Sequence, residues 1–356
     1  MDFDLEMLRR LPKTDLHVHL DGSLRAETIL DLANSQGIPL PTRDRAELAK
    51  MLCPAKGTEL ATYLKVFELT LLVLQTEEAL ERVAFELAED AAKENVWYLE
   101  VRFSPILHRA RGLELQPIVD AVLRGLGRAE RRYRIRTGVI VCGIRQIGPD
   151  VSLQLAELAL LYKSRGVVGF DLAGEEKDYP PKHHREAFSR VLNHNINSTV
   201  HAGEAFGAPS IHQAIHYCGA HRIGHGTHLQ EDPDLLDYIN DHRIPLEMCL
   251  TSNVQTGATE SYETHPFGAY FRKGLRVTIN TDNRLMSNTD LSRELQIACS
   301  VFDLDVMDLR KILINGFKSA FLPYAEKVAL LKDAITVWDA IFSEYFPSYH
   351  PYRTFL

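Results

Sequence analysis

The chain has 356 residues, of which 45% are apolar and 25% are charged, as in ordinary soluble globular enzymes. Its formal net charge of −8 argues against nucleic acid or an anionic membrane as the main partner. No apolar run reaches the length of a membrane span, and the acidic start 1–6 lacks the basic and apolar regions of a secretory signal. The five cysteines are scattered and form no Cys-x-x-Cys pair, which indicates reduced thiols. We therefore expect a cytoplasmic protein.

Short apolar runs alternate with longer helical patterns along the chain. Most of these runs are continuous, as expected for parallel strands that are covered on both faces. A helical pattern over 153–164 is typical of the intervening segments, Thr76 before two acids indicates a helix start, and Gly37 indicates a stop. The eight candidate strands are 15–20, 96–104, 137–143, 167–172, 198–202, 222–225, 245–250 and 276–281.

Eight strands that alternate with helices predict an α/β fold, a (β/α)₈ TIM barrel, with a doubly wound sheet as the alternative. We expect one domain over 1–356, with extra helices after the first strand, roughly 25–93, and at the C-terminus, roughly 303–346. Insertions after barrel strands lie on the catalytic face. The first insertion is therefore a candidate lid or, equally, a packing helix pair. The glycine-rich fingerprints of dinucleotide and P-loop sites do not occur.

Two histidines, His17 and His19, stand two residues apart in the first candidate strand. Side chains two apart on a strand point to the same side, so both imidazoles can converge on one metal ion. A pair of exposed histidines on a half-buried strand is the alternative. His201 and Asp282 end two later strands, at the face where barrel enzymes keep their chemistry. The four residues form a three-nitrogen, one-oxygen set that suits Zn²⁺ and leaves room for a water.

Two further residues stand close to these ligands in the predicted barrel. His225 lies between two glycines at a strand end, which favours an acid/base role beside the metal over a fifth ligand. Glu204 follows His201 by three residues, and a partly desolvated carboxyl there can stay protonated and act as a general acid. A glutamate that compensates the dipole of a helix N-terminus is the alternative for Glu204.

The end of the fourth candidate strand, 169–174, bears on the number of metal ions. Binuclear barrel hydrolases need a bridging lysine or carboxylate on a central strand, and this segment contains no lysine. We therefore expect one metal. Asp171 is a carboxylate on this strand that could bridge two ions, but its position inside the strand favours a structural role. Gly174 would let a backbone N–H reach a ligand. The remaining histidines lack comparable context. We expect His183 and His184 in a solvated loop, and His212, His216, His221 and His228 on the surface or on helices.

Seven motifs, in this order along nearly the whole chain, resemble the adenosine deaminase family. Each is weak by itself, but the ordered set is specific. They are Asp15-Leu16-His17-Val18-His19-Leu20-Asp21-Gly22, Glu100-Val101-Arg102-Phe103-Ser104-Pro105, Phe170-Asp171-Leu172-Ala173-Gly174-Glu175, His201-Ala202-Gly203-Glu204, Arg222-Ile223-Gly224-His225-Gly226, Cys249-Leu250-Thr251-Ser252-Asn253 and Asn280-Thr281-Asp282.

The resemblance implies a zinc-dependent barrel that converts adenosine and 2′-deoxyadenosine to the inosine forms and ammonia, with one Zn²⁺ held by His17, His19, His201 and Asp282. It further implies the catalytic and substrate contacts. Glu204 would protonate purine N1, and His225 would deprotonate or orient the zinc-bound water. Asp21 and His19 would lie near the ribose, and the Gly174 amide would reach N3.

One position departs from the family pattern. Where the family commonly has a second aspartate that hydrogen-bonds purine N7, this chain has Asn283. N7 only accepts hydrogen bonds, and an asparagine amide donates without the protonation that an aspartate needs. Asn283 is therefore compatible with a purine, and it leaves open a relative that acts on adenine or a modified adenosine.

Two rival classes predict other sequence features. A metal-dependent ester or phosphoester hydrolase on the same barrel would need a second metal or an anion site, and no basic cluster lies near the ligand motifs. A non-catalytic adenosine-binding protein would lack Glu204 or a ligand, and none is missing. Cytidine-type deaminases are excluded because Pro-Cys-x-x-Cys does not occur. We expect a small purine nucleoside as the partner; the sequence leaves the oligomeric state open.

Overall fold

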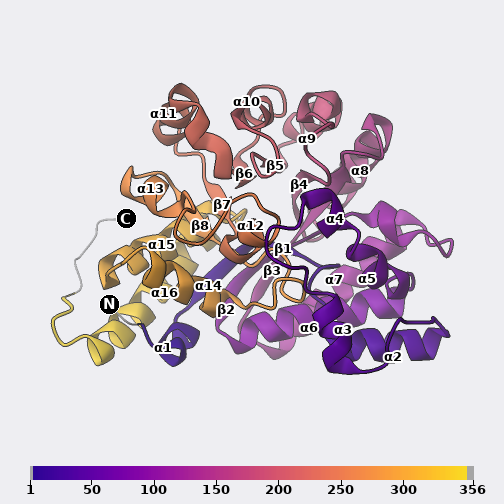
Figure 1. Ribbon diagram of the computed structural model, residues 1–356, viewed down its shortest axis with the longest axis horizontal. Coiled ribbons are helices and arrows are strands. Elements are labelled where there is room, and N and C mark those ends of the chain that lie inside the picture. The colour runs from indigo at the N-terminus through magenta and orange to yellow at the C-terminus, as the bar shows by residue number, and fades with distance from the viewer. Residues whose placement is uncertain (1–2, 351–356) are drawn as a thin grey trace.

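The computed structural model describes residues 3–350, so positions 1–2 and 351–356 of the expected domain lie outside the described residues. Eight parallel strands pair in chain order, and an isolated parallel bridge between Val18 and Asp282 joins the end of the sheet to its beginning. The predicted TIM barrel is confirmed (Figure 1). The strands are β1 (Lys13–His19), β2 (Val96–Phe103), β3 (Arg136–Ile144), β4 (Val167–Ala173), β5 (Asn197–Ala202), β6 (Arg222–His225), β7 (Leu246–Met248) and β8 (Val277–Ile279).

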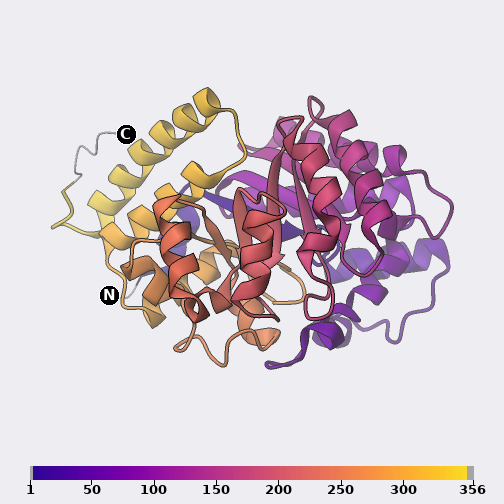
Figure 2. The same ribbon diagram turned by 90° about the horizontal axis from the view of Figure 1, so that it is seen from above.

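Helices surround the strands on all sides, as the view from above shows (Figure 2). The strands are buried almost throughout, which explains their continuous apolar character. The helices are α1 (Leu5–Arg10), α2 (Ala26–Gln36), α3 (Arg45–Met51), α4 (Leu60–Leu64), α5 (Phe67–Val73), α6 (Glu77–Lys93), α7 (Leu115–Arg132), α8 (Pro149–Tyr162), α9 (Arg185–Leu192), α10 (Ala208–His216), α11 (Pro233–Asp241), α12 (Leu250–Gln255), α13 (Phe267–Arg272), α14 (Leu291–Val301), α15 (Val306–Ser319) and α16 (Tyr324–Tyr345). Short 3₁₀ turns are η1 (Pro105–His108), η2 (Pro181–His184) and η3 (Thr227–Glu231).

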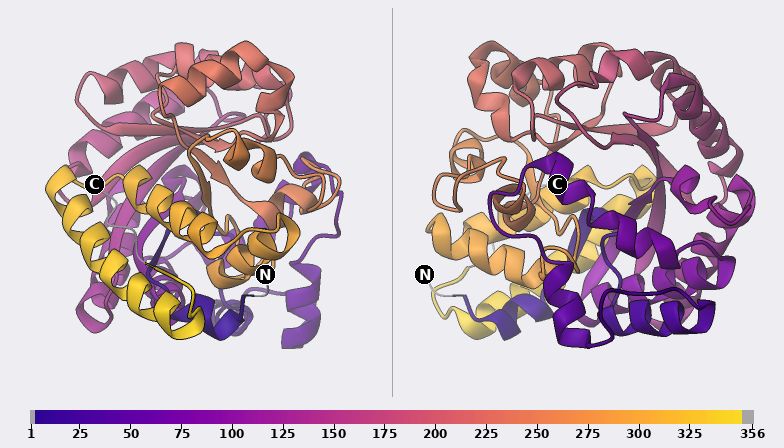
Figure 3. Two further views of the ribbon diagram at one scale, coloured as in Figure 1. Left: turned by 90° about the vertical axis from the view of Figure 1, so that its left-hand side faces the viewer. Right: turned by 45° about the vertical axis from the view of Figure 1, so that its right-hand side comes forward.

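The insertion between β1 and β2 contains α2 to α6, and its helix signals were predicted correctly. Thr76 caps α6 by accepting a hydrogen bond from the backbone N–H of Ala79 at 3.2 Å. Gly37 ends α2 in the left-handed conformation, with φ of +66°. The helices α4 and α5 of this insertion lie across the carboxyl ends of the strands (Figure 3, right).

The extra helices expected at the C-terminus, over 303–346, are α15 and α16. The long helix α16 runs beside α1 (Figure 3, left). The indole of Trp338 donates a hydrogen bond to the carbonyl of Pro12 at 2.8 Å, which ties α16 to the start of β1. No helix among residues 3–350 is both long and apolar enough to cross a membrane.

Candidate active site

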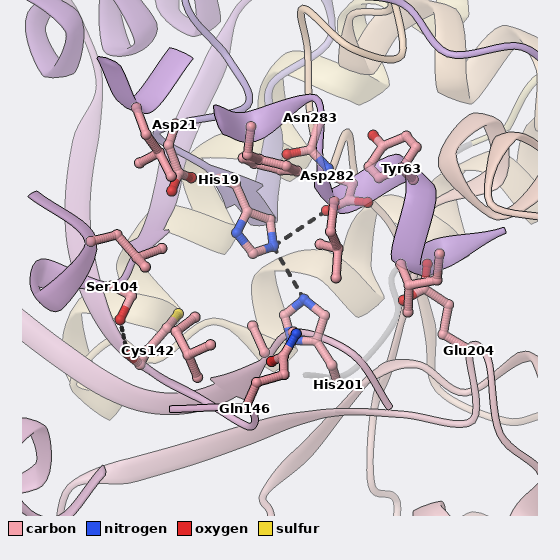
Figure 4. Close-up of a pocket in the computed structure, with 18 of the residues that line it drawn as sticks. His19, Asp21, Tyr63, Ser104, Cys142, Gln146, His201, Glu204, Asp282 and Asn283 are labelled. Carbon is pink, nitrogen blue, oxygen red and sulfur yellow. Dashed lines mark hydrogen bonds and ion pairs between the residues drawn. The ribbon is translucent and has the colours of Figure 1, made fainter. Parts of the chain in front are cut away.

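Side chains from four strand ends converge at the carboxyl face of the barrel. The ligating atoms of His17, His201, His225 and Asp282 all lie within 4.8 Å of one another, and all four residues are buried. His19 joins them, because its Nε2 lies 3.1 Å from Nε2 of His201 and 3.4 Å from Oδ1 of Asp282 (Figure 4). The structure therefore brings together all four predicted metal ligands, with His225 beside them.

The backbone around this cluster shows why the local sequence is constrained. Gly224 lies against the ring of His17, and a Cβ there would come within 3.0 Å of the His17 Cε1 atom. His225 and Asp282 adopt φ of +64° and +59°, in the left-handed region that side chains other than glycine rarely enter. Such strain persists where the surrounding structure holds it, and it concentrates at functional sites. Backbone hydrogen bonds from Asp282 N to His17 O at 2.8 Å, and from His19 N to Asp282 O at 2.7 Å, provide that hold.

Buried carboxylates orient two of the histidines from behind. Oε2 of Glu247 lies 2.9 Å from Nδ1 of His17, and Oδ2 of Asp171 lies 3.0 Å from Nδ1 of His201. Arg102 pairs with both carboxylates, at 2.9 Å from Asp171 and 2.8 Å from Glu247. A carboxylate that accepts the Nδ1 proton fixes the tautomer of the ring and leaves the lone pair of Nε2 free to bind a metal. Asp171, besides its place in the strand, orients His201. Glu247 orients His17 and is a site residue that the sequence interpretation missed.

The unsatisfied atoms of this cluster fit a metal ion. His17 is fully buried, and its Nε2 has no hydrogen-bond partner in the described part of the chain. Ser252 donates to Oδ2 of Asp282 at 2.5 Å, while Oδ1 faces the Nε2 atoms of His17 and His19 at 3.4 Å. Burial lowers the pKa of His201, which keeps its imidazole neutral and able to ligate. The result is a buried metal-binding cluster of histidines and one aspartate.

Glu204 faces the same cavity from the loop after β5. Its side chain is buried, Oε1 accepts a hydrogen bond from Thr256 at 3.1 Å, and Oε2 lies 3.6 Å from Nε2 of His225. Burial, and then the charge of Asp282, raise the pKa of Glu204 well above its usual range. A carboxyl that is neutral near pH 7 can donate a proton, which is what a general acid requires.

A second carboxylate that the sequence interpretation missed holds the Glu204 loop in place. Glu176 is buried after β4 and accepts hydrogen bonds from four successive backbone N–H groups, those of residues 203–206, at 2.6 to 3.1 Å. Its carboxylate therefore fixes the direction in which the Glu204 side chain leaves the backbone. Nothing in the local sequence distinguishes Glu176 from its neighbour Glu175, because the signal is a contact across 27 to 30 residues.

His225 is oriented by a polar chain behind it. The side-chain oxygen Oδ1 of Asn253 accepts a hydrogen bond from the backbone N–H of Cys249 at 3.4 Å, and the same oxygen lies 3.1 Å from Nε2 of His265. Its amide group is therefore free to donate to Nδ1 of His225, at 2.9 Å. Burial, and then His17, hold the pKa of His225 well below its usual value. The neutral ring consequently carries its proton on Nε2, on the side of Glu204.

The predicted substrate-contact residues line one cavity with the metal cluster and Glu204 (Figure 4). Asp21 is 4% exposed, its Oδ1 has no partner among residues 3–350, and burial raises its pKa to about 7. Asn283 is buried with Oδ1 against Gly22, where a Cβ would come within 1.8 Å of that oxygen. Gly174 has φ of +103°, and the amide oxygen of Gln146 lies where a Cβ of residue 174 would be.

The insertion supplies another wall of this cavity, lined by Leu60, Tyr63, Leu64, Phe67 and Leu71. A candidate lid or a packing helix pair was expected in this insertion, and the helical apolar spacing alone could not distinguish contact with a ligand from contact with the core.

The other histidines follow the expectations with one exception. His212, His216 and His221 are exposed, as predicted, and His228 is half-buried on η3. The prediction for His184 is wrong, because this residue is 2% exposed and its Nδ1 lies 2.8 Å from the hydroxyl of Ser152. The two prolines before it begin the turn η2, which packs against α8 instead of projecting into solvent.

Comparisons with known proteins agree with this site. The family model of adenosine deaminase matches residues 12–337. The adenosine deaminase of Mycobacterium sp. (strain KMS) is 46% identical over 347 residues, which cover 93% of this chain and 96% of that protein. The adenine deaminase of Arthrobacter aurescens has a TM-score of 0.86 at 27% identity, covering 92% of this chain and 98% of that one. The N6-methyl-AMP deaminase of Arabidopsis thaliana has a TM-score of 0.83 at 25% identity, covering 94% and 98%. The chain belongs to the adenosine deaminase family.

Proposed function

We propose that the protein hydrolyses adenosine and 2′-deoxyadenosine to inosine and 2′-deoxyinosine with release of ammonia. The observation that carries the proposal is one cavity at which the buried metal-binding cluster, Glu204 and His225 meet. Burial raises the pKa of Glu204 and lowers the pKa of His225, which favours the neutral form of each. Relatives named adenosine deaminase, at 44% to 46% identity over 93% of the chain, support the assignment.

We propose one Zn²⁺ per chain, held by His17, His19, His201 and Asp282. Three imidazoles and one carboxylate are a donor set that zinc favours in catalytic sites. Zinc, when bound in such a site, lowers the pKa of a water from 15.7 to about 7 and so supplies a nucleophile at neutral pH. His225 is left out of the ligand set because Asn253 donates to its Nδ1 and its Nε2 carries a proton.

The chain's own residues account for the remaining chemistry. Carbon C6 of adenine is a poor electrophile, because attack breaks the aromaticity of the ring. Glu204 donates a proton to N1 as the water oxygen adds to C6, while His225 orients the water through Nε2. One of the two water protons passes to the amino nitrogen, the C6–N6 bond breaks and ammonia leaves. The other water proton restores the Glu204 carboxyl, so a carbonyl oxygen stands at C6 and N1 keeps its proton. Positioned acid catalysis of this kind contributes about 10²–10⁴ in rate.

The cavity wall favours a nucleoside over a nucleotide or a free base. No lysine or arginine is among the described residues that line the cavity, so a phosphate would find no cationic partner there. The Asp21 carboxyl and His19 instead offer hydrogen bonds to ribose hydroxyls. In this arrangement Gly174 contacts N3 and the Asn283 amide donates to N7. The alternative is a deaminase of adenine or a modified adenosine in the same family. Two structural neighbours, an adenine deaminase and an N6-methyl-AMP deaminase, are of this kind.

A substrate panel on zinc-loaded protein tests the proposal. Adenosine, 2′-deoxyadenosine, adenine and AMP are followed by the change in purine absorbance on deamination. We expect turnover of both nucleosides, with kcat/KM for adenine and AMP lower by at least about 10³. Adenine lacks the ribose that Asp21 and His19 would contact, and the phosphate of AMP has no cationic partner among the described residues of the cavity. Adenine or AMP as the best substrate would contradict the proposal and favour the alternative.

A further inference from the structure

Tyr63 on α4 has a buried hydroxyl whose role the reaction described above leaves open. The residue is 2% exposed, and its Oη has no hydrogen-bond partner in the described part of the chain. It lines the same cavity as Glu204 and the metal-binding cluster. Because buried polar groups are nearly always hydrogen-bonded, an isolated hydroxyl on a cavity wall points to a partner that arrives with the ligand.

The position of this hydroxyl along the cavity wall narrows the choice of partner. Tyr63 lies between Asn283 and Glu204 (Figure 4). The side chains of Ser287 and Asn283 lie close to its hydroxyl, but neither is in hydrogen-bonding geometry with it. In the proposed binding mode Glu204 faces purine N1 and Asn283 faces N7. On the purine ring, C6 and its amino group occupy the edge between N1 and N7, so this edge faces Tyr63.

We propose that Tyr63 contacts the C6 amino group of the substrate and restricts the enzyme to unsubstituted 6-aminopurines. This inference rests on the proposed adenosine deamination and deepens it. The phenol oxygen accepts a hydrogen bond from the N6–H that points toward N7. The opposite N6–H points toward N1, where the Glu204 carboxyl leaves no room for a larger group.

A methyl group on N6 would therefore meet protein in either orientation. Turned toward N1, it blocks Glu204 from the atom that must be protonated; turned toward N7, it meets the Tyr63 hydroxyl and removes its partner. The reaction of such a substrate would otherwise be the same. Water adds to C6, the C6–N6 bond breaks, and methylamine leaves in place of ammonia. Tyr63 would thus favour adenosine over N6-methyladenosine in two ways, by excluding the methyl group and by losing its hydrogen bond when the methyl group is present.

Contacts with neighbouring residues fix the position of the Tyr63 side chain, which selection between substrates requires. Its backbone N–H donates to Glu59 O at 2.9 Å within the helical turn, and its ring packs edge-on against Phe67 with centroids 6.3 Å apart. The preceding segment is tied to the barrel, because Gly57 N donates to Val254 O at 3.1 Å and Thr58 N donates to Gln255 O at 2.8 Å.

The test compares kcat/KM for adenosine and N6-methyladenosine in the wild type, Tyr63→Phe and Tyr63→Ala. In Tyr63→Phe we expect KM for adenosine to rise up to about tenfold with kcat little changed, because a contact made before and during the reaction is lost. In Tyr63→Ala we expect the preference for adenosine over N6-methyladenosine to fall by about tenfold or more, because the N7-side position opens. Tyr63→Leu replaces the alanine variant if that variant fails to fold.

Phe67→Ala is the matched control, since it removes an aromatic ring from the same wall without removing a hydroxyl. It should lower kcat/KM for both substrates alike. A preference for adenosine that changes by less than about threefold in every Tyr63 variant, or that falls equally in Phe67→Ala, overturns the inference. Absence of adenosine turnover in the wild type would instead contradict the proposed function, so the two failures are distinguishable.

Discussion

The two walls of the active cavity differ in how their buried polar atoms are satisfied. On the metal side, Nδ1 of His17 and Nδ1 of His201 each face a buried carboxylate from another strand, at 2.9 and 3.0 Å. On the substrate side, Asp21 Oδ1, Asn283 Oδ1 and Tyr63 Oη have no partner among residues 3–350. The protein itself orients the histidines of the first wall, whereas in the proposed binding mode the substrate supplies the partners of Asp21 and Tyr63 on the second. Metal binding and substrate recognition should therefore respond to different substitutions.

The most severe test of this separation removes a ligand from the metal side. Asp282→Ala leaves His17 and His19 without the oxygen that faces them at 3.4 Å. We expect the purified variant to lack stoichiometric zinc and to have no measurable deaminase activity. Metal analysis beside an activity assay measures both, with Asp282→Asn as the variant of equal size. Full zinc content in Asp282→Ala would remove this residue from the ligand set.

Glu204→Gln is the complementary change, because it alters the acid and leaves the metal side intact. The amide has nearly the same shape and still accepts from Thr256 through its carbonyl oxygen, but it cannot supply a proton to N1. We expect kcat to fall by about 10²–10⁴ while zinc content stays at the wild-type value. Near-normal turnover would exclude Glu204 from the mechanism, and loss of zinc would show that the two walls are not separate.

Asp171→Asn should weaken metal binding indirectly, through the ligand His201. The amide no longer supplies a carboxylate to Nδ1 of His201, so the ring loses part of its orientation and basicity. Changes of this kind cost about 10–100-fold in metal affinity. Competition with a chelator measures the affinity, and a thermal melt of the zinc-loaded variant controls for the altered Arg102 pair. An unchanged affinity would mean that Asp171 stabilises the fold without tuning the metal site.

The smallest expected effect is a shift in the pH profile on the acid side of the chemistry. Thr256 donates to Glu204 at 3.1 Å and thereby lowers the pKa of Glu204, against the larger upward shift that burial causes. Thr256→Val removes this donor, so the pKa of Glu204 should rise further. Because the protonated acid is the active form, activity is lost as pH rises through this pKa. The alkaline limb of kcat should therefore move to higher pH; a move to lower pH would contradict the assignment.

Much of the barrel and the ligand set could be predicted from the sequence because both depend on local pattern. All eight expected strands are present, since continuous apolar runs between helical segments mark buried parallel strands. The four predicted metal ligands lie at strand ends, and His225 is marked by the glycines on either side of it. These signals require no knowledge of distant contacts.

The supporting residues could not be found in this way, because their roles are contacts between distant segments. Asp171, Glu176 and Glu247 reach their partners across 27 to 230 residues. Glu247 did carry one signal: it is the only charged residue in the apolar run 245–250, and a charge in a buried strand must be paired. His184 was misassigned because a proline pair is typical of exposed loops, whereas here it begins a turn that packs against α8.

The most direct test of the central claim is a zinc titration of metal-free protein with adenosine turnover as the readout. If one ion held by the metal side supplies the nucleophile and Glu204 supplies the proton, activity should rise in proportion to added zinc and stop rising at one equivalent per chain. Full activity in the metal-free protein, or a plateau reached only at two equivalents, would contradict the account.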